Sequence, residues 1–230
     1  MKFLMSGYSG RMGQQIVALA EAEGVGQLVY GWSPRAEGER AIQNLSEADP
    51  GKVKIVIDFS LPPGFREALI WSKENGIPFF SGTTGLEDSD FQLLKEAANS
   101  IPVLWAPNTS LGVNFLNELI RHLGALDGFD YQIIEAHHNQ KKDAPSGTAL
   151  FLQETLNSVV KNPAPDPLAI RGGGIFGDHE IMAMSKEEVI TIKHSALTRS
   201  VFARGAIKGA LWLKNQAPGH YSMKDILGLK

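Results

Sequence analysis

The sequence predicts an α/β protein built on a doubly wound parallel sheet, with a smaller α+β domain inserted into it. Within residues 1–108, short apolar runs alternate with longer amphipathic runs, which is the rhythm of repeated βαβ units. After Asn108 this rhythm gives way to a helix, a strand, a second helix and two more strands, and the C-terminal residues return to helix. We therefore expect one domain over residues 1–109 and 204–230, and an inserted domain over residues 110–203.

The elements of the first domain follow from its apolar pattern. Short apolar runs that end in small or polar residues predict strands, and amphipathic runs that stop at Gly76 or at the Asn99-Ser100 turn predict helices. Strands are expected at residues 2–5, 27–32, 54–60, 77–82 and 101–108, and helices at 13–24, 65–76 and 90–100. Because consecutive βαβ units join parallel strands, one parallel sheet is expected here.

The inserted domain has a different order of elements. A helix is expected at 111–123, a strand at 130–136, a helix from about residue 147 to 160, and strands at 179–185 and 187–196. The segment NPAPDP, residues 162–167, indicates a linker or loop, and the sheet should be mixed or largely antiparallel. A helix at 205–216 and the short apolar segment DILGL then return to the first domain.

The composition excludes several classes of function. Lys and Arg total 22 against 25 Asp and Glu, a formal net charge of -3, which argues against a protein that binds nucleic acid or an anionic membrane. No apolar run approaches the roughly 20 residues of a membrane span, and the N-terminus has no signal-type pattern, so we expect a cytoplasmic protein. The absence of cysteine excludes disulfides, thiolate zinc sites and cysteine nucleophiles.

A glycine-rich loop, MSGYSGRMGQQI, connects the first strand to the first helix. Glycines at 7, 10 and 13 permit a tight turn and close approach of the backbone to a pyrophosphate, and the helix start supplies free N–H groups. The spacing is GxxGxxG, not the commoner GxGxxG, so taken alone the motif is also compatible with an ordinary strand-to-helix turn. At the start of a βαβ series it predicts a Rossmann-type dinucleotide site.

The end of the second strand, GWSPR, bears on which nicotinamide cofactor is used. An acidic residue here would read the ribose hydroxyls of NAD, whereas a basic neighbourhood would accept a 2′-phosphate. Ser33 and Arg35 occupy this position, and no carboxylate occurs before Glu37. A hydroxyl and a guanidinium can bind a phosphate, so we predict NADPH, with NADH possible. The alternative is that this segment is only a turn.

Three further strand ends carry small polar residues: IDFS, SGTTG and APNTS, which begin at residues 57, 81 and 106. In a doubly wound sheet the carboxyl ends of the strands border the ligand crevice. Any one of these segments is compatible with ordinary turn chemistry. Three at corresponding positions favour a cofactor edge.

The stretch EAHHNQKKDAPSGTAL, residues 135–150, concentrates the polar chemistry of the inserted domain. Strand alternation should place Glu135 and His137 on one face and His138 on the other. A helix that begins near Ser146 would offer backbone N–H groups to an anion, with hydroxyls beside them, and Lys141 or Lys142 would add charge. Histidine supplies a group that titrates near neutrality.

The alternative interpretation of this stretch is a capped helix after a solvated basic loop. A metal site is disfavoured, because neighbouring histidines on a strand diverge and no carboxylate or thiolate array completes a coordination shell. We therefore expect an anion-binding, proton-transferring site without a metal.

Together, GYSGRMG, VIDFS, SGTTG, APNTS and EAHHNQKKDAPSGTA resemble the 4-hydroxy-tetrahydrodipicolinate reductase (dihydrodipicolinate reductase) family, over nearly the whole chain. The resemblance implies NAD(P)H-dependent reduction of a cyclic dicarboxylate in the diaminopimelate route to lysine. It implies that His137 is the proton donor and Lys141 the second catalytic residue. It also implies a homotetramer formed through the sheet of the second domain, with a dimer as the alternative.

The resemblance assigns the other site residues to two groups, read together with the patterns above. The substrate carboxylates are expected at His138, Ser146, Gly147, Thr148 and Arg199. The cofactor is expected at Gly7, Tyr8, Ser9, Gly10, Arg11, Met12, Gly13, Ser33, Arg35, Phe59, Gly82, Thr83, Thr84, Ala106, Pro107, Asn108 and Thr109. Residues 1–109 and 204–230 thus become the expected dinucleotide-binding domain, and residues 110–203 the substrate-binding, catalytic and oligomerisation domain.

Two other hypotheses about the function remain open from the sequence. Another NADP-linked dehydrogenase of amino-acid synthesis is possible, although an aspartate-semialdehyde type enzyme needs a cysteine and the chain has none. A non-catalytic NADPH-binding regulatory protein is the alternative from a different class. The intact His137, Lys141 and Ser-Gly-Thr turn argue against it.

Overall fold

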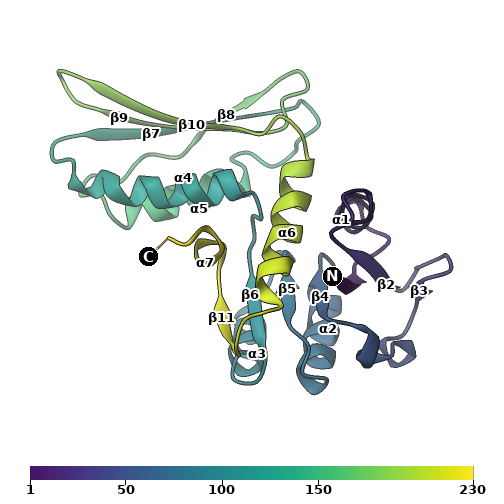
Figure 1. Cartoon of the computed structure of the whole chain (residues 1–230). Helices are drawn as coiled ribbons and strands as arrows, with labels where there is room; N and C mark the ends of the chain where they lie inside the picture. Colours follow the sequence, from purple (N-terminus) through teal and green to yellow (C-terminus); the bar gives the residue numbers. More distant parts are fainter. Residues whose placement is uncertain (230) are drawn as a thin grey trace. The chain divides into compact units, whose positions relative to one another are not determined.

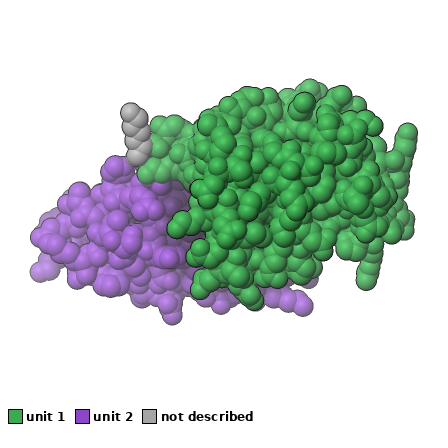
Figure 2. Space-filling view, turned by 90° about the horizontal axis from the view of Figure 1, so that it is seen from below, with its two compact units in different colours: residues 1–110, 202–230 green, residues 111–201 purple. Residues whose placement is uncertain are grey.

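The computed structural model describes residues 1–229, and the chain forms two compact units (Figures 1 and 2). The first unit comprises Met1–Ser110 and Phe202–Lys230, and the second comprises Leu111–Val201. No helix within residues 1–229 is long and apolar enough to cross a membrane.

The first unit contains a seven-stranded sheet in which every neighbouring pair is parallel. The strand order, β11-β6-β5-β4-β1-β2-β3, reverses direction between β1 and β4, which makes this the switch point of a doubly wound sheet. The strands are β1 (Lys2–Ser6), β2 (Gln27–Trp32), β3 (Ala41–Ile42), β4 (Ile55–Asp58), β5 (Phe79–Ser81), β6 (Pro102–Trp105) and β11 (Gly219–Tyr221).

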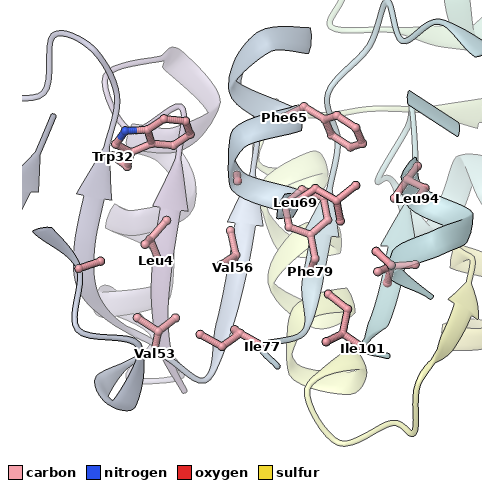
Figure 3. Close-up of a cluster of buried hydrophobic side chains, with 14 of the residues drawn as sticks. Leu4, Trp32, Val53, Val56, Phe65, Leu69, Ile77, Phe79, Leu94 and Ile101 are labelled. Atoms are coloured by element: carbon pink, nitrogen blue, oxygen red, sulfur yellow. The ribbon is translucent and has the colours of Figure 1, made fainter. Parts of the chain in front are cut away.

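Helices cover both faces of this sheet. They are α1 (Arg11–Ala22), α2 (Pro62–Glu74), α3 (Asp88–Ala97), α6 (Ser200–Leu213) and α7 (Met223–Leu227), with 3₁₀ turns at Leu45–Glu47 and Pro50–Lys52. One register row, formed by Leu4, Val56, Phe79 and Val103, belongs to the core cluster that includes the inner faces of α2 and α3 (Figure 3). All four side chains are fully buried.

The next register row points to the opposite face because successive strand side chains alternate. It contains Met5, Ile57, Phe80 and Leu104, all fully buried. On this face Gly209 of α6 lies against the ring of Phe80. The continuous apolar strands and the helices on both faces confirm the predicted Rossmann-type sheet.

The second unit is a four-stranded mixed sheet with two helices on one face. Its strands are β7 (Asp130–His137), β8 (Leu168–Arg171), β9 (Asp178–Met184) and β10 (Val189–Ser195), in the order β10-β9-β7-β8, and only β7 and β8 are parallel. Helices α4 (Leu111–Arg121) and α5 (Gly147–Asn157) cover one face, and a 3₁₀ turn spans His122–Ala125. The core of this unit lies between the sheet and the two helices, and its members include Leu116, Ile133, Leu152 and Ile181.

Three strands were not predicted from the sequence: β3, β8 and β11. Each has only two to four residues, so no alternation could develop, and each is defined by its pairing, β3 with β2, β8 with β7 and β11 with β6. Helix α6 begins at Ser200, not at Gly205 as the sequence suggested. Gly205 therefore lies inside the helix. It is glycine because a Cβ there would lie 2.8 Å from the carbonyl carbon of Thr109, so no other residue allows this close approach.

Gly7 shows why the loop after β1 needs glycine. Its φ of 78° lies in the left-handed region, and a Cβ there would lie 2.7 Å from the carbonyl carbon of Phe59 and 2.9 Å from the amide nitrogen of Ser60. A side chain would therefore force apart the ends of β1 and β4. This is the position where the strand order reverses.

Candidate functional site

A cavity of about 660 Å³ opens at the carboxyl ends of the central strands of the first unit. Its walls come from the glycine loop after β1, from the ends of β2 and β4, and from the start of α2. The lining residues are Gly7, Ser9, Gly10, Trp32, Ser33, Pro34, Gln43, Asn44, Phe59, Ser60, Leu61, Pro63, Gly64 and Glu67. A largely apolar wall with a few polar groups is typical of a small-molecule site.

The start of α1 faces this cavity through Gly10, which is the N-cap residue. Glycine has no side chain, so no cap hydrogen bond is made, and the N–H groups of the first helical turn have no intrahelical acceptor. The first turn contains no acidic residue. These groups and the helix dipole can bind a phosphate, so the loop fits the diphosphate of a dinucleotide.

A fully buried carboxylate, Asp58 at the end of β4, joins three strand ends beside this cavity. Its Oδ1 accepts hydrogen bonds from the hydroxyls of Ser6 at 2.7 Å and Ser60 at 2.5 Å, and its Oδ2 accepts from Ser81 and Thr83, both at 2.7 Å. Burial raises the pKa of Asp58, and the hydroxyl donors oppose that effect. The network fixes the loops that follow β1, β4 and β5.

In the second unit, a second fully buried carboxylate lies next to a histidine. Glu135 and His137 project from the same face of β7, and Nδ1 of His137 is 2.5 Å from Oε2 of Glu135. Arg171, at the end of β8, donates from Nη1 to Oε2 at 2.8 Å and from Nη2 to Oε1 at 2.6 Å. This is a bidentate pair, the strongest geometry for a guanidinium and a carboxylate.

The protonation of this group follows from its contacts. Burial by itself would raise the pKa of Glu135, but the hydrogen bonds from Arg171 and His137 outweigh burial and lower that pKa. Burial lowers the pKa of His137, against the raising effect of Glu135. Glu135 is therefore ionised, and His137 is a buried imidazole that is not held permanently charged.

The N-terminus of α5 lies against the same carboxylate. The backbone N–H of Ser146, the N-cap residue, donates to Oε1 of Glu135 at 3.1 Å, and the Ser146 hydroxyl accepts from the N–H of Ala149 at 3.2 Å. The space where a Cβ of Gly147 would lie is empty to 4 Å, so the backbone there is open to a ligand. An exposed helix start of this kind is a receptor for a carboxylate.

Two charged groups flank the helix start. Lys141 donates from Nζ to both carboxylate oxygens of Asp143 at 2.8 Å. Nη2 of Arg199 lies 3.3 Å from Nε2 of His138, and since a guanidinium can only donate, His138 is the acceptor. Lys141 and Arg199 thus bring positive charge to the second unit, with Asp143 as the partner of Lys141 and His138 as the partner of Arg199.

A second histidine, His179 on β9, lies behind His137. The two rings meet edge to face with centroids 5.3 Å apart, and Nε2 of His179 is 3.3 Å from the hydroxyl of Ser146. Burial, followed by the nearby His137 and His194, lowers the pKa of His179 to about 4. It is thus a neutral imidazole at physiological pH. Within residues 1–229, no group of three or more histidine, cysteine or acidic side chains is arranged to hold a metal ion.

Two family models match consecutive parts of the chain: "Dihydrodipicolinate reductase, N-terminus" over residues 1–109 and "Dihydrodipicolinate reductase, C-terminus" over residues 112–227. A 4-hydroxy-tetrahydrodipicolinate reductase of Bdellovibrio bacteriovorus is 46% identical over 226 residues, 98% of this chain and 96% of the relative. One from Zymomonas mobilis is 38% identical over 99% of this chain and 97% of the relative. The chain belongs to the dihydrodipicolinate reductase family.

A solved structure shows the same fold. The dipicolinate-bound dihydrodipicolinate reductase of Paenisporosarcina sp. TG-14 matches with a TM-score of 0.85 over 96% of this chain and 97% of its own, at 20% sequence identity. The resemblance inferred from the sequence motifs is confirmed, as is the Rossmann-type sheet with a second, mixed-sheet domain.

For this member of the dihydrodipicolinate reductase family, the structure places only some of the predicted cofactor residues around the cavity. These are Gly7, Ser9, Gly10, Ser33 and Phe59. The Ser33 hydroxyl is hydrogen-bonded to that of Ser9 at 2.8 Å, and Arg35 is exposed beyond the cavity wall. The other predicted cofactor positions lie outside the lining: Tyr8, Arg11, Met12, Gly13, Arg35, Gly82, Thr83, Thr84, Ala106, Pro107, Asn108 and Thr109.

Several of these outer positions have structural partners. The ring of Tyr8 covers Gly31, and Gly82 lies against the ring of Phe59. Thr83 belongs to the Asp58 network, and the Thr109 hydroxyl donates to the carbonyl oxygen of Phe202 at 2.8 Å. These residues shape the strand ends around the cavity.

β7 ends at His137, whose ring contacts Glu135, and His138 follows the strand and contacts Arg199, so the two histidines have separate partners. The sequence did not predict a role for Arg171 or His179, nor the contact between Glu135 and the Ser146 N–H. Arg171 is 36 positions away from Glu135 and reaches it through a strand pairing that no local pattern revealed. Only the Glu-x-His spacing, which puts two side chains on one face, gave a local signal.

The buried His179 predicts a pH dependence of stability. Its folded pKa of about 4 lies below the roughly 6.5 of an unfolded histidine, so its neutral form stabilises the fold above that range. Stability should fall as the pH drops from about 6.5 to about 4, by at most about 3 kcal/mol from this residue. Urea unfolding across this range should show a smaller loss for His179→Gln than for the wild type.

The exposed His122 offers a matched control. His122→Gln should keep the wild-type loss of unfolding free energy between these pH values. An equal loss in His179→Gln and the wild type would show that His179 is not the group responsible.

Proposed function

We propose that this chain is a 4-hydroxy-tetrahydrodipicolinate reductase, which uses NAD(P)H to reduce (hydroxy)dihydrodipicolinate to tetrahydrodipicolinate in the diaminopimelate pathway to lysine. The observation that carries this proposal is the full-length match, 46% identical, to a relative of that name. The arrangement of His137, Glu135 and the start of α5 supports it, because it joins a titratable group to an anion receptor.

The first unit is the proposed binding site for the cofactor. The uncapped start of α1 and the close-packed Gly7 accommodate a diphosphate, and the apolar wall of the cavity accommodates the adenosine. When bound, NAD(P)H supplies the hydride. Phe59 and the Asp58 network hold the strand ends in shape around it.

The second unit is the proposed binding site for the substrate. A cyclic dicarboxylate needs two groups of donors for its two carboxylates. The helix start at Ser146, Gly147 and Thr148 is one, and the cluster of His138, Lys141 and Arg199 is the other. The relative from Paenisporosarcina holds dipicolinate, a planar dicarboxylate, which supports this class of ligand.

His137 is the proposed proton donor, and Lys141 the second catalytic residue. Reduction of a double bond adds a hydride and then a proton, and the His137 imidazole, whose pKa burial lowers, can deliver that proton and take up another from solvent. Lys141, now paired with Asp143, can turn its ammonium to a substrate carboxylate. We also propose that the enzyme works in the cytoplasm, where reduced nicotinamide cofactor is available.

The reductase activity is tested with purified protein, NADPH or NADH, and the product of the preceding synthase, by following loss of nicotinamide absorbance. His137→Gln and Lys141→Ala should each lower kcat/KM by about 100-fold or more, because a positioned proton donor or charge is lost. Cofactor affinity, measured by fluorescence titration, should hardly change.

Two neighbours serve as matched controls. Lys142→Ala, at an exposed position beside Lys141, and His122→Gln should retain near wild-type turnover. Wild-type protein that oxidises neither cofactor in a substrate-dependent manner would refute the reductase proposal. Loss of NADPH binding in His137→Gln would show that His137 belongs to the cofactor site and would contradict its assignment as the proton donor.

NADPH preference is the proposed role of Arg35. The residue follows Ser33 and Pro34, which line the cavity, and its exposed guanidinium can reach a 2′-phosphate by turning toward it. Arg35→Ala should lower the ratio of kcat/KM for NADPH to that for NADH by about tenfold, the loss expected for one charge-assisted contact. Lys95→Ala, an equal change of charge on the exposed side of α3, should leave the ratio unchanged. An unchanged ratio in Arg35→Ala would remove Arg35 from cofactor recognition.

The uncovered face of the second sheet is the proposed surface for homo-oligomer formation. Leu168 and Ile170 of β8 and Val189 of β10 are 52–55% exposed there, and no helix of the second unit covers this face. We propose a homotetramer, with a dimer as the alternative assembly.

Leu168→Lys should therefore shift the protein toward smaller species in size-exclusion chromatography with light scattering. The matched control is Ile70→Lys, at an exposed position of α2 in the first unit, and this variant should keep the size of the wild-type species. A monomeric wild type would contradict the proposal.

A further inference from the structure

Every oxygen of the buried Glu135 carboxylate is occupied. Oε2 accepts from Nδ1 of His137 at 2.5 Å and from Nη1 of Arg171 at 2.8 Å, and Oε1 accepts from Nη2 of Arg171 at 2.6 Å and from the Ser146 N–H at 3.1 Å. An ionised carboxylate can only accept hydrogen bonds. The proton between Glu135 and His137 therefore belongs to Nδ1.

We infer that Glu135 and Arg171 are positioning residues for the proposed proton donor: they hold the His137 ring with a protonated Nδ1 toward Glu135, so that Nε2 is the nitrogen that delivers the proton to the substrate. This inference rests on the proposed function and assigns its proton step to one atom. Arg171 acts through Glu135, and Glu135 acts through His137.

The side of the ring that carries Nε2 is kept open. His137 Nε2 makes no hydrogen bond with any residue in the range 1–229, and its neighbour is Gly177, where a Cβ would come to 3.0 Å from Nε2. The φ of Gly177 does not lie in the left-handed region, so its backbone would accept an alanine. Only the space beside Nε2 excludes a side chain there.

Four charged or titratable groups face His137, and they come from three strands and one loop. Glu135 on β7 favours the imidazolium, while Arg171 on β8 and Lys141 in the loop after β7 disfavour it. His179 on β9 is neutral at physiological pH. Removing the negative charge and removing the positive charge should therefore change the basicity of His137 in opposite directions.

The same carboxylate also ties the donor to the proposed carboxylate receptor. Its Oε1 holds the N–H of Ser146, which begins α5, while its Oε2 holds His137. The ring and the helix start thus share one anchor, and a substrate carboxylate bound at the helix start has a fixed place relative to the proton donor.

The test uses the full-length protein labelled with ¹⁵N in its histidine rings. Long-range NMR correlations give the tautomer and pKa of each ring, and His137→Gln identifies the His137 signals. At a pH where the ring is neutral, the wild type should show the Nδ1–H tautomer. Glu135→Gln should lower the pKa of His137, and Arg171→Gln should raise it, each by about one unit.

The same variants are followed by turnover. Because the imidazolium is the donor, activity falls as the pH rises through the pKa of His137, so this limb of the kcat profile should move to lower pH in Glu135→Gln and to higher pH in Arg171→Gln. A loss of packing alone would not move the two profiles in opposite directions. If Glu135→Gln does not fold, the inference is tested by the His137 tautomer in the wild type and by the pKa of His137 in Arg171→Gln.

Gly177 supplies an independent check on the Nε2 assignment. Gly177→Ala should lower kcat by about tenfold or more while the Nδ1–H tautomer persists, because the methyl group occupies the space at Nε2. Gly174→Ala in the same loop is the control, since a Cβ there meets no atom within 4 Å and its φ is not left-handed. Equal activity of the two variants would overturn the role of Nε2.

The remaining outcomes separate this inference from the proposed function. An Nε2–H tautomer in an active wild type, or pKa shifts of the same sign in the two charge variants, would overturn the inference and leave the reductase intact. A wild type without turnover that still shows the Nδ1–H tautomer and opposite shifts would contradict the function, because the NMR measurement does not require catalysis.

Discussion

The Glu135 carboxylate is the interaction on which the proposed catalytic region depends. It is fully buried, and an unpaired carboxylate there would cost several kcal/mol. Four hydrogen bonds from three residues remove that cost: one from His137 in the same strand, two from Arg171 in the neighbouring strand, and one from Ser146 at the start of α5. Each donor is fixed in return, so one charge determines the positions of a ring, a strand end and a helix.

A buried carboxylate has a comparable place in the first unit, with different chemistry. Asp58 also ends a central strand and also joins segments that are distant in the sequence. Its donors are neutral, four hydroxyls and the N–H of Ser60, and burial raises its pKa, whereas the guanidinium lowers the pKa of Glu135. Asp58 thus joins the ends of β1, β4 and β5 through the hydroxyls of Ser6, Ser81 and Thr83. Glu135, by contrast, favours the charged form of the His137 ring beside it, because its hydrogen bond and its charge raise the pKa of that ring.

The sequence predicted what local patterns encode. The apolar rows of β1, β4, β5 and β6 recur at the correct spacing, so the doubly wound sheet followed from periodicity, and the Glu-x-His alternation placed Glu135 and His137 together. It could not predict Arg171, because β8 follows a proline-containing loop and is defined only by its pairing with β7. Nor could it show that the Ser33 hydroxyl is held by Ser9, or that Arg35 lies outside the cavity wall. Such contacts depend on tertiary geometry.

The two adjacent histidines, His137 and His138, have different surroundings. His137 is the last residue of β7 and lies on its buried face, while His138 follows the strand and contacts Arg199. Burial weakens the charged form of His137, and Glu135 restores part of it, so this ring can gain and lose a proton. Nε2 of His138 accepts a hydrogen bond from the guanidinium of Arg199, so the His138 ring is held by a different partner from the His137 ring. One peptide unit therefore separates a ring held by a buried carboxylate from a ring held by a guanidinium, and a shift of β7 by one residue would change the environments of both.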